Sequence, residues 1–173
     1  MDLDADERLR RLYTEHAPGL LAYGLRRGAT PEDAADLVAD VFLAAWRRLD
    51  DVPAGEEARP WLYGVARRVL ANQRRGERRR TRLGEALREH VRTLEAPTEP
   101  ADPVLHEALR ALPNLDRALL ALVAWEGLTA SQAAAVLGLR PVTARVRLHR
   151  ARARLDRELA GGATRLHAEG AIQ

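Results

Sequence analysis

The chain has 173 residues and a formal net charge of +3, with 46% hydrophobic and 31% charged side chains. This balance is typical of a folded globular protein and excludes a chain that is disordered throughout. The absence of cysteine excludes disulfides, thiolate metal sites and a cysteine nucleophile. No apolar run reaches the roughly 20 residues of a membrane-spanning helix, and the acidic start is unlike a signal peptide. We therefore expect a cytoplasmic protein with no membrane insertion.

Apolar residues with the helical period predict two helices in the first fifty residues. The first covers about Leu9–Leu25 and ends near Gly28, because glycine commonly terminates a helix. Thr30 and Pro31 mark the start of the second, since threonine caps helices and proline suits the first helical position. The polar face of this second helix carries three aspartates in line, namely Asp33, Asp36 and Asp40. Two explanations of these acids remain open: acidic side chains are favoured near the positive N-terminal end of the helix dipole, or they form a docking surface.

A third helix is predicted over Pro60–Arg75, after a loop that begins at Asp50. It opens with Trp61 and Tyr63 and continues into an arginine cluster that spans residues 67–82. Charge runs are usually solvated, and aromatic residues at helical spacing more often belong to a core. The alternative is a surface on which aromatic rings and arginines receive an unstacked base. The sequence pattern leaves both interpretations open.

The segment from about residue 84 to residue 103 differs from its surroundings. It contains three prolines and has weak periodicity, which is typical of a flexible linker. A coil of this length averages roughly 25 Å from end to end. Two helical clusters joined in this way could occupy DNA sites more than one helical turn apart.

After two short helices between residues 105 and 125, the pattern of Gly127–Leu155 is typical of a helix-turn-helix. Thr129 can cap its first helix, and the small Ala134 allows two helices to cross closely. Gly138 permits the positive φ that the turn requires. Because this motif binds DNA, it indicates the substrate class directly.

The second helix of that motif carries six candidates for DNA contact: Thr143, Arg145, Arg147, Arg150, Arg152 and Arg154. The first three lie near the helix N-terminus, which enters the major groove in recognition helices, so we expect them at base edges. The last three are better placed for phosphate. The alternative is an arginine-coated solvent face, which the correctly spaced Ala134 and Gly138 disfavour.

Charge and periodicity together predict two heads. The net charge is −6 over residues 1–57, +8 over 58–82, −4 over 83–116 and +5 over 117–173. Two basic segments in an otherwise acidic chain are typical of a phosphate-binding surface used twice. No stretch alternates with period two, so we expect no sheet. The prediction is an all-α protein with a first domain over 1–82, a linker over 83–103, a helix-turn-helix domain over 104–160 and a tail over 161–173.

Several motifs follow one another in a characteristic order. They are Asp33-Ala-Ala-Asp36-Leu-Val-Ala-Asp40-Val-Phe42-Leu-Ala-Ala-Trp46, Trp61-Leu62-Tyr-Gly-Val-Ala-Arg67-Arg68, Ala111-Leu-Pro113 with Arg117, Glu126-Gly127-Leu-Thr, and Arg147-Leu-His-Arg-Ala-Arg-Ala-Arg-Leu155. In this order they resemble the extracytoplasmic-function (ECF) sigma factors of bacterial RNA polymerase, over roughly residues 9–159. The resemblance implies that the first domain binds the polymerase clamp and melts the minus-ten element. It implies that the second domain reads the minus-thirty-five element.

The resemblance also assigns residues by position. On the surface that docks against the clamp helices it places Asp36, Asp40 and Leu43. Facing the opened minus-ten strand, together with the loop Asp50–Arg59, it places Trp61, Arg67, Arg68, Asn72 and Arg75. The chain departs from the family pattern at three places. Ala39-Asp40 stands where the family usually has Gln-Glu, and Arg68 and Asn72 stand where it often has Asn and Asp. Arg140-Pro141-Val142 replaces a Ser-x-Gly type sequence at the start of the recognition helix.

The implied mechanism is non-enzymatic, because core polymerase carries the chemistry and the chain supplies promoter specificity. The five histidines are scattered without metal-ligand spacing, so we expect no catalytic residue, metal or cofactor. The expected partners are core RNA polymerase, promoter DNA and, by hypothesis from the family, an anti-sigma factor. Two alternatives remain: a stand-alone helix-turn-helix regulator that does not bind core polymerase, and a helical adaptor protein.

Overall fold

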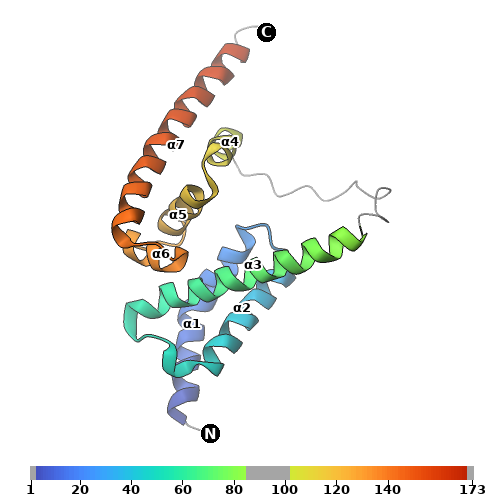
Figure 1. Cartoon of the computed structure of the whole chain (residues 1–173), viewed down its shortest axis with the longest axis vertical. Helices are drawn as coiled ribbons and strands as arrows, with labels where there is room; N and C mark the ends of the chain where they lie inside the picture. The colour runs from blue at the N-terminus through green and yellow to red at the C-terminus, as the bar shows by residue number, and fades with distance from the viewer. Residues whose placement is uncertain (1–2, 85–101, 171–173) are drawn as a thin grey trace. The chain divides into compact units, whose positions relative to one another are not determined.

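The computed structural model describes the backbone of residues 3–84 and 102–170, and the side chains of residues 4–73, 102 and 104–161. All regular elements in these ranges are helices, which confirms the all-α prediction. The helices form two compact units, one before and one after residues 85–101 in the sequence (Figure 1). Most of the predicted linker, 83–103, lies outside the described residues.

The first unit, called here the α1–α3 unit, contains three long helices that pack on one another (Figure 1). They are α1 (Leu3–Leu25), α2 (Pro31–Arg47) and α3 (Ala58–Gly84), with single 3-10 turns at Leu49–Asp51 and Gly55–Glu57 between α2 and α3. Leu20, Leu37 and Leu62, one from each helix, are completely buried and form the centre of the core. The rings of Tyr23 and Tyr63 meet edge to face at 5.1 Å, which fixes α1 against α3.

The turn between α1 and α2 follows the sequence prediction. Gly28 has a φ of +79°, which glycine adopts without strain. Thr30 caps α2, because its Oγ1 accepts a hydrogen bond of 3.1 Å from the Asp33 backbone N–H. The helix α1 begins at Leu3 rather than at Leu9, where apolar periodicity starts. Its first turn carries acidic side chains, which the positive end of the helix dipole favours even without an apolar stripe.

The second unit, called here the α4–α7 unit, contains three short helices that pack on a long one (Figure 1). Its elements are α4 (Pro103–Ala111), α5 (Asn114–Ala124), α6 (Ala130–Leu137) and α7 (Pro141–Gly170). Leu119, Leu122 and Ala151 are buried between α5 and α7. The last helix continues to Gly170, through residues that the sequence analysis assigned to a tail.

The turn between α6 and α7 has the geometry of the predicted helix-turn-helix. Thr129 and Gln132 form a reciprocal capping box at the start of α6, with hydrogen bonds of 3.2 and 3.0 Å. Gly138 ends α6 with a φ of +68°, in the left-handed region. Ala134 and Ala144 are completely buried where the two helices meet. The small residues therefore allow the close crossing that the sequence predicts.

Candidate nucleic-acid interface

The helix α7 separates its buried and exposed side chains as the sequence predicts. Ala144, Leu148 and Ala151 are buried against the other helices of the unit. Five of the six candidate DNA contacts are exposed, namely Thr143, Arg145, Arg150, Arg152 and Arg154. Arg147, the sixth, is half-buried. The face that the α4–α7 unit presents along α7 is therefore strongly cationic.

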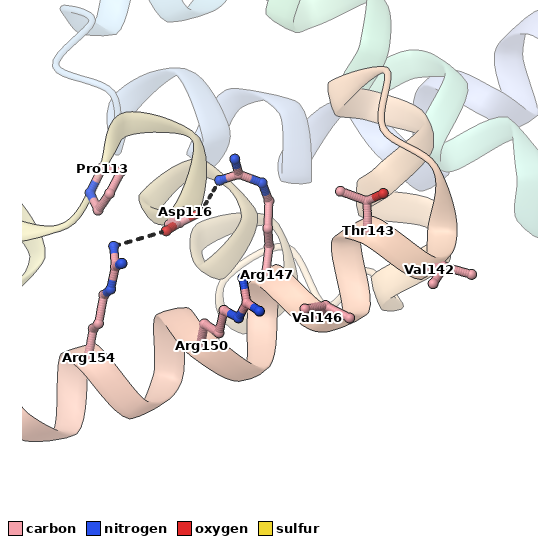
Figure 2. Close-up of a pocket in the computed structure, with 8 residues that line it drawn as sticks. All are labelled: Pro113, Asp116, Val142, Thr143, Val146, Arg147, Arg150 and Arg154. Carbon is pink, nitrogen blue, oxygen red and sulfur yellow. Dashed lines mark hydrogen bonds and ion pairs between the residues drawn. The ribbon is translucent and has the colours of Figure 1, made fainter.

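A groove with a volume of about 620 Å³ lies between the start of α5 and the first turns of α7 (Figure 2). Its lining residues are Pro113, Asp116, Val142, Thr143, Val146, Arg147, Arg150 and Arg154. Val142 and Val146 are 63% and 46% exposed, so the groove has an apolar edge beside its arginines. Three guanidinium groups against one carboxylate leave it with a net positive charge.

The carboxylate in this groove belongs to Asp116, which is only 5% exposed. Arg147 Nη1 donates a hydrogen bond of 2.6 Å to Asp116 Oδ1. Arg154 Nη1 lies 3.7 Å from Asp116 Oδ2. Figure 2 shows both arginines directed from α7 toward this one side chain. Because a buried carboxylate is costly without a partner, these contacts explain how Asp116 is accommodated in the α4–α7 unit.

Asp116 is not among the site residues predicted from the sequence, although a signal was present. Asp116 lies three and four residues before Leu119 and Leu120, so it shares the buried face of α5 with them. An acid on an apolar face needs a cationic partner. Arginines abound in the chain, and the pattern alone does not identify which of them serves.

The candidate minus-ten residues lie along α3. Arg67, Arg68 and Asn72 are exposed, whereas Trp61 is half-buried. Arg75 belongs to α3, but its side chain lies outside the described residues. Tyr63 is 2% exposed and packs on Tyr23, so of the two aromatic residues at the start of α3 it belongs to the core.

The connection between α2 and α3 is anchored to the helices. Val52 is 2% exposed, and its carbonyl oxygen accepts a hydrogen bond from Arg8 of α1. Arg48 Nη2 lies 2.8 Å from Asp51 Oδ2, so an ion pair joins two residues within the first turn of the connection. Arg8 is not among the residues predicted from the sequence, because nothing in its local pattern points to Val52, 44 residues further along the chain.

The candidate clamp-binding residues share the outer face of α2. Asp36 and Asp40 are exposed, and Leu43 is 47% exposed. Trp46, near the end of this helix, is 43% exposed. It lies three residues from Leu43 and so neighbours it on the helix surface. The two residues form an apolar patch next to the acidic positions.

The described residues show no group of three or more histidine, aspartate or glutamate side chains that could hold a metal ion. Within the same ranges, no helix is long and apolar enough to cross a membrane.

His16 is 9% exposed, and its burial lowers the pKa of the imidazole. The negative charge of Glu15 raises this pKa, whereas the positive charge of Arg59 lowers it further.

Both units match known families. Residues 12–80 match the family described as Sigma-70 region 2, and residues 104–155 match Sigma-70, region 4. The ECF RNA polymerase sigma factor SigL of Mycobacterium tuberculosis is 33% identical over 148 residues, which cover 82% of each chain. The RNA polymerase sigma factor CnrH of Cupriavidus metallidurans is 34% identical over 152 residues, which cover 79% of this chain and 78% of that protein.

Solved structures show the same likeness. The sigma factor RpoE from Bartonella quintana, in complex with the anti-sigma factor NepR, has a TM-score of 0.65 and 26% identity. The match covers 89% of this chain and 98% of RpoE. The structure of CnrH in complex with the cytosolic domain of CnrY has a TM-score of 0.62 and 25% identity, and the match covers 90% of each chain.

Proposed function

This chain belongs to the ECF RNA polymerase sigma factors, and from that membership we propose how its two helical units divide promoter recognition. Sigma factors are initiation factors without catalytic chemistry of their own, so we assign no active site to this chain. Core polymerase supplies the active site, and the chain supplies promoter specificity. It needs no cofactor for this work and acts in the cytoplasm, where polymerase and promoter meet.

The α4–α7 unit, within domain 104–160, reads the minus-thirty-five element. Thr143, Arg145 and Arg147 contact base edges from the first turns of α7, while Arg150, Arg152 and Arg154 contact phosphate. The exposure of five of these six side chains and the net positive charge of the groove beside them support contact with DNA. Because phosphate contacts release counterions, binding weakens steeply with salt.

The α1–α3 unit, within domain 1–82, reads and opens the minus-ten element. The residues that face the opened strand are Trp61, Arg67, Arg68, Asn72 and Arg75, together with the loop that Arg8 anchors. Exposed arginines beside a half-buried aromatic ring can neutralise phosphate and receive an unstacked base. Capture of flipped bases supplies free energy for opening.

The outer face of α2 binds core polymerase. Asp36 and Asp40 supply charge, and Leu43 supplies apolar contact area beside them. The exposure of Leu43 supports this role. A solvent-facing leucine beside an exposed tryptophan is apolar surface whose burial against a partner protein is favourable in free energy.

An anti-sigma protein holds the chain inactive until a signal releases it. This part of the proposal draws on RpoE, solved with the anti-sigma factor NepR, and on CnrH, solved with the cytosolic domain of CnrY. The partner would compete with polymerase or promoter DNA for the surfaces described above.

The presence of one exposed basic face in each of two separate units carries the proposal. We would reconstitute holoenzyme and select active promoters from libraries randomised separately at the two elements. Arg145→Ala should relax minus-thirty-five preference by about tenfold at one position and leave minus-ten preference intact. Asn72→Ala should do the reverse.

Arg157→Ala is the matched control, because Arg157 is exposed on α7 beyond the six candidates. It should alter neither preference. The proposed roles of the two units would be overturned if Arg145→Ala or Asn72→Ala relaxed base preference equally at both elements. They would also be overturned if neither variant relaxed base preference at either element.

A further inference from the structure

We propose that Asp116 is a positioning residue that sets minus-thirty-five specificity by holding the Arg147 guanidinium in place before DNA arrives. The inference rests on the proposed contact of Arg147 with a base edge. Asp116 lies on α5 and Arg147 on α7, so the contact joins two helices of the same unit.

The geometry of the pair favours a fixed orientation. The bond of 2.6 Å from Arg147 Nη1 to Asp116 Oδ1 is a short, charge-assisted hydrogen bond. Asp116 is 5% exposed, so water reaches the carboxylate poorly and does not easily replace the arginine. The contact uses one of the five N–H donors of the guanidinium, and Arg147 lines the groove, so the other donors remain for a base edge.

A fixed arginine discriminates better than a mobile one. Arginine has many rotamers, and a side chain ordered in advance loses less entropy when it meets its base. A fixed fork also matches one arrangement of acceptors and fails on others, whereas a mobile guanidinium can turn to the nearest phosphate. Asp116 therefore favours the matched element over other sequences.

Arg154 contributes a second effect through the same carboxylate. Its Nη1 lies 3.7 Å from the other oxygen of Asp116, and Arg154 and Arg147 are seven residues apart, about two turns of α7. The negative charge between them offsets part of the attraction of α7 for any phosphate backbone. Loss of Asp116 should therefore strengthen sequence-independent binding while it weakens discrimination.

A purely structural role predicts something different. If Asp116 only joined α5 to α7, its removal would lower the stability of the α4–α7 unit without changing which bases are preferred. Base preference, measured at a position that Arg147 reads, separates the two roles.

The test uses holoenzyme assembled with the full chain and a promoter library randomised across the minus-thirty-five element. Arg147→Ala first identifies the position that Arg147 reads. Asp116→Asn should relax preference at that same position by about tenfold, and should add nothing in the Arg147→Ala background. It should also raise affinity for a duplex with a scrambled element. Arg157→Gln, at an exposed position of α7 outside the six candidates, is the matched control, which should keep the preference because the Arg147 contact remains.

Unchanged preference in Asp116→Asn, or full additivity with Arg147→Ala, would overturn the inference. If Asp116→Asn does not fold, Asp116→Glu replaces it in the test. This variant keeps the negative charge but displaces the guanidinium of Arg147 by one methylene. A base preference equal to that of the wild type in Asp116→Glu would also overturn the inference. If Arg147→Ala relaxes no position at all, the proposed base contact fails, and this inference fails with it.

Discussion

The guanidinium of Arg8 donates a hydrogen bond of 2.5 Å to the carbonyl oxygen of Val52, across 44 residues of sequence. Val52 is 2% exposed and lies in the connection between α2 and α3. The bond therefore fixes that connection against α1. Because the connection leads directly into α3, Arg8 also determines where the proposed minus-ten surface begins.

Substitution of Arg8 by alanine should loosen the connection between α2 and α3. The Val52 carbonyl would lose a charge-assisted hydrogen bond, at a cost of about 1.5–3 kcal/mol. Hydrogen exchange of backbone amides in residues 49–58 should accelerate accordingly. Arg11→Ala is the control, because its ion pair with Glu7 is exposed and contributes little. Equal acceleration in both variants would contradict the anchoring role.

Acidification should destabilise the α1–α3 unit through His16. Burial lowers the pKa of its imidazole in the folded state below the ordinary value of 6.5. The unfolded chain therefore binds the proton more readily, so the stabilising contribution is complete above about pH 7 and is lost as the pH falls through the unfolded pKa toward the folded one. The free energy of unfolding, measured in urea between pH 7.5 and 5.5, should fall less steeply in His16→Gln. His149→Gln, at an exposed position, should keep the wild-type slope.

Two glycines of the α4–α7 unit should respond to alanine with opposite signs. Gly138 has a φ of +68°, and an added Cβ would meet no atom within 4 Å, so the cost of Gly138→Ala comes from the backbone alone. That cost is about 1–2 kcal/mol. Gly161 lies inside α7, also in open space, and Gly161→Ala should stabilise the unit by about 0.5–1 kcal/mol. Chemical denaturation measures both, and a shared sign would contradict the turn geometry.

Leu43→Glu should weaken binding to core polymerase by about tenfold or more, because it introduces a charge into the proposed apolar contact. Since Leu43 is 47% exposed, the thermal unfolding midpoint of the Leu43→Glu variant should differ little from that of the wild type. Leu25→Glu, at a position 43% exposed at the end of α1, is the matched control. Equal losses of core affinity in the two variants would argue against a site confined to the outer face of α2.

Local signals predicted much of the fold. Thr30, Thr129 and Gly138 each specify a helix boundary through a cap or a φ value that few other residues supply, and the structure confirms all three. Apolar periodicity likewise predicted the helices α2 and α3. The start of α1 was missed because acidic residues, and not apolar ones, favour its first turn.

The relationships between distant residues could not be predicted in this way. Asp116 meets Arg147 only because α5 and α7 pack together, and Arg8 meets Val52 only because the connection after α2 folds back on α1. Both depend on tertiary packing, which helical periodicity does not encode. Trp46 is 43% exposed, although a tryptophan at helical spacing is ordinarily assigned to the core.

Promoter binding and opening with and without core polymerase test the central claim most directly. We would measure the affinity of the chain for promoter duplex alone and in holoenzyme, and follow opening by the permanganate reactivity of minus-ten thymines. A sigma factor of this kind should bind core, direct specific initiation and open the minus-ten element only in the holoenzyme. Tight, specific binding of the free chain to duplex, with no affinity for core, would contradict the account and favour a stand-alone helix-turn-helix regulator.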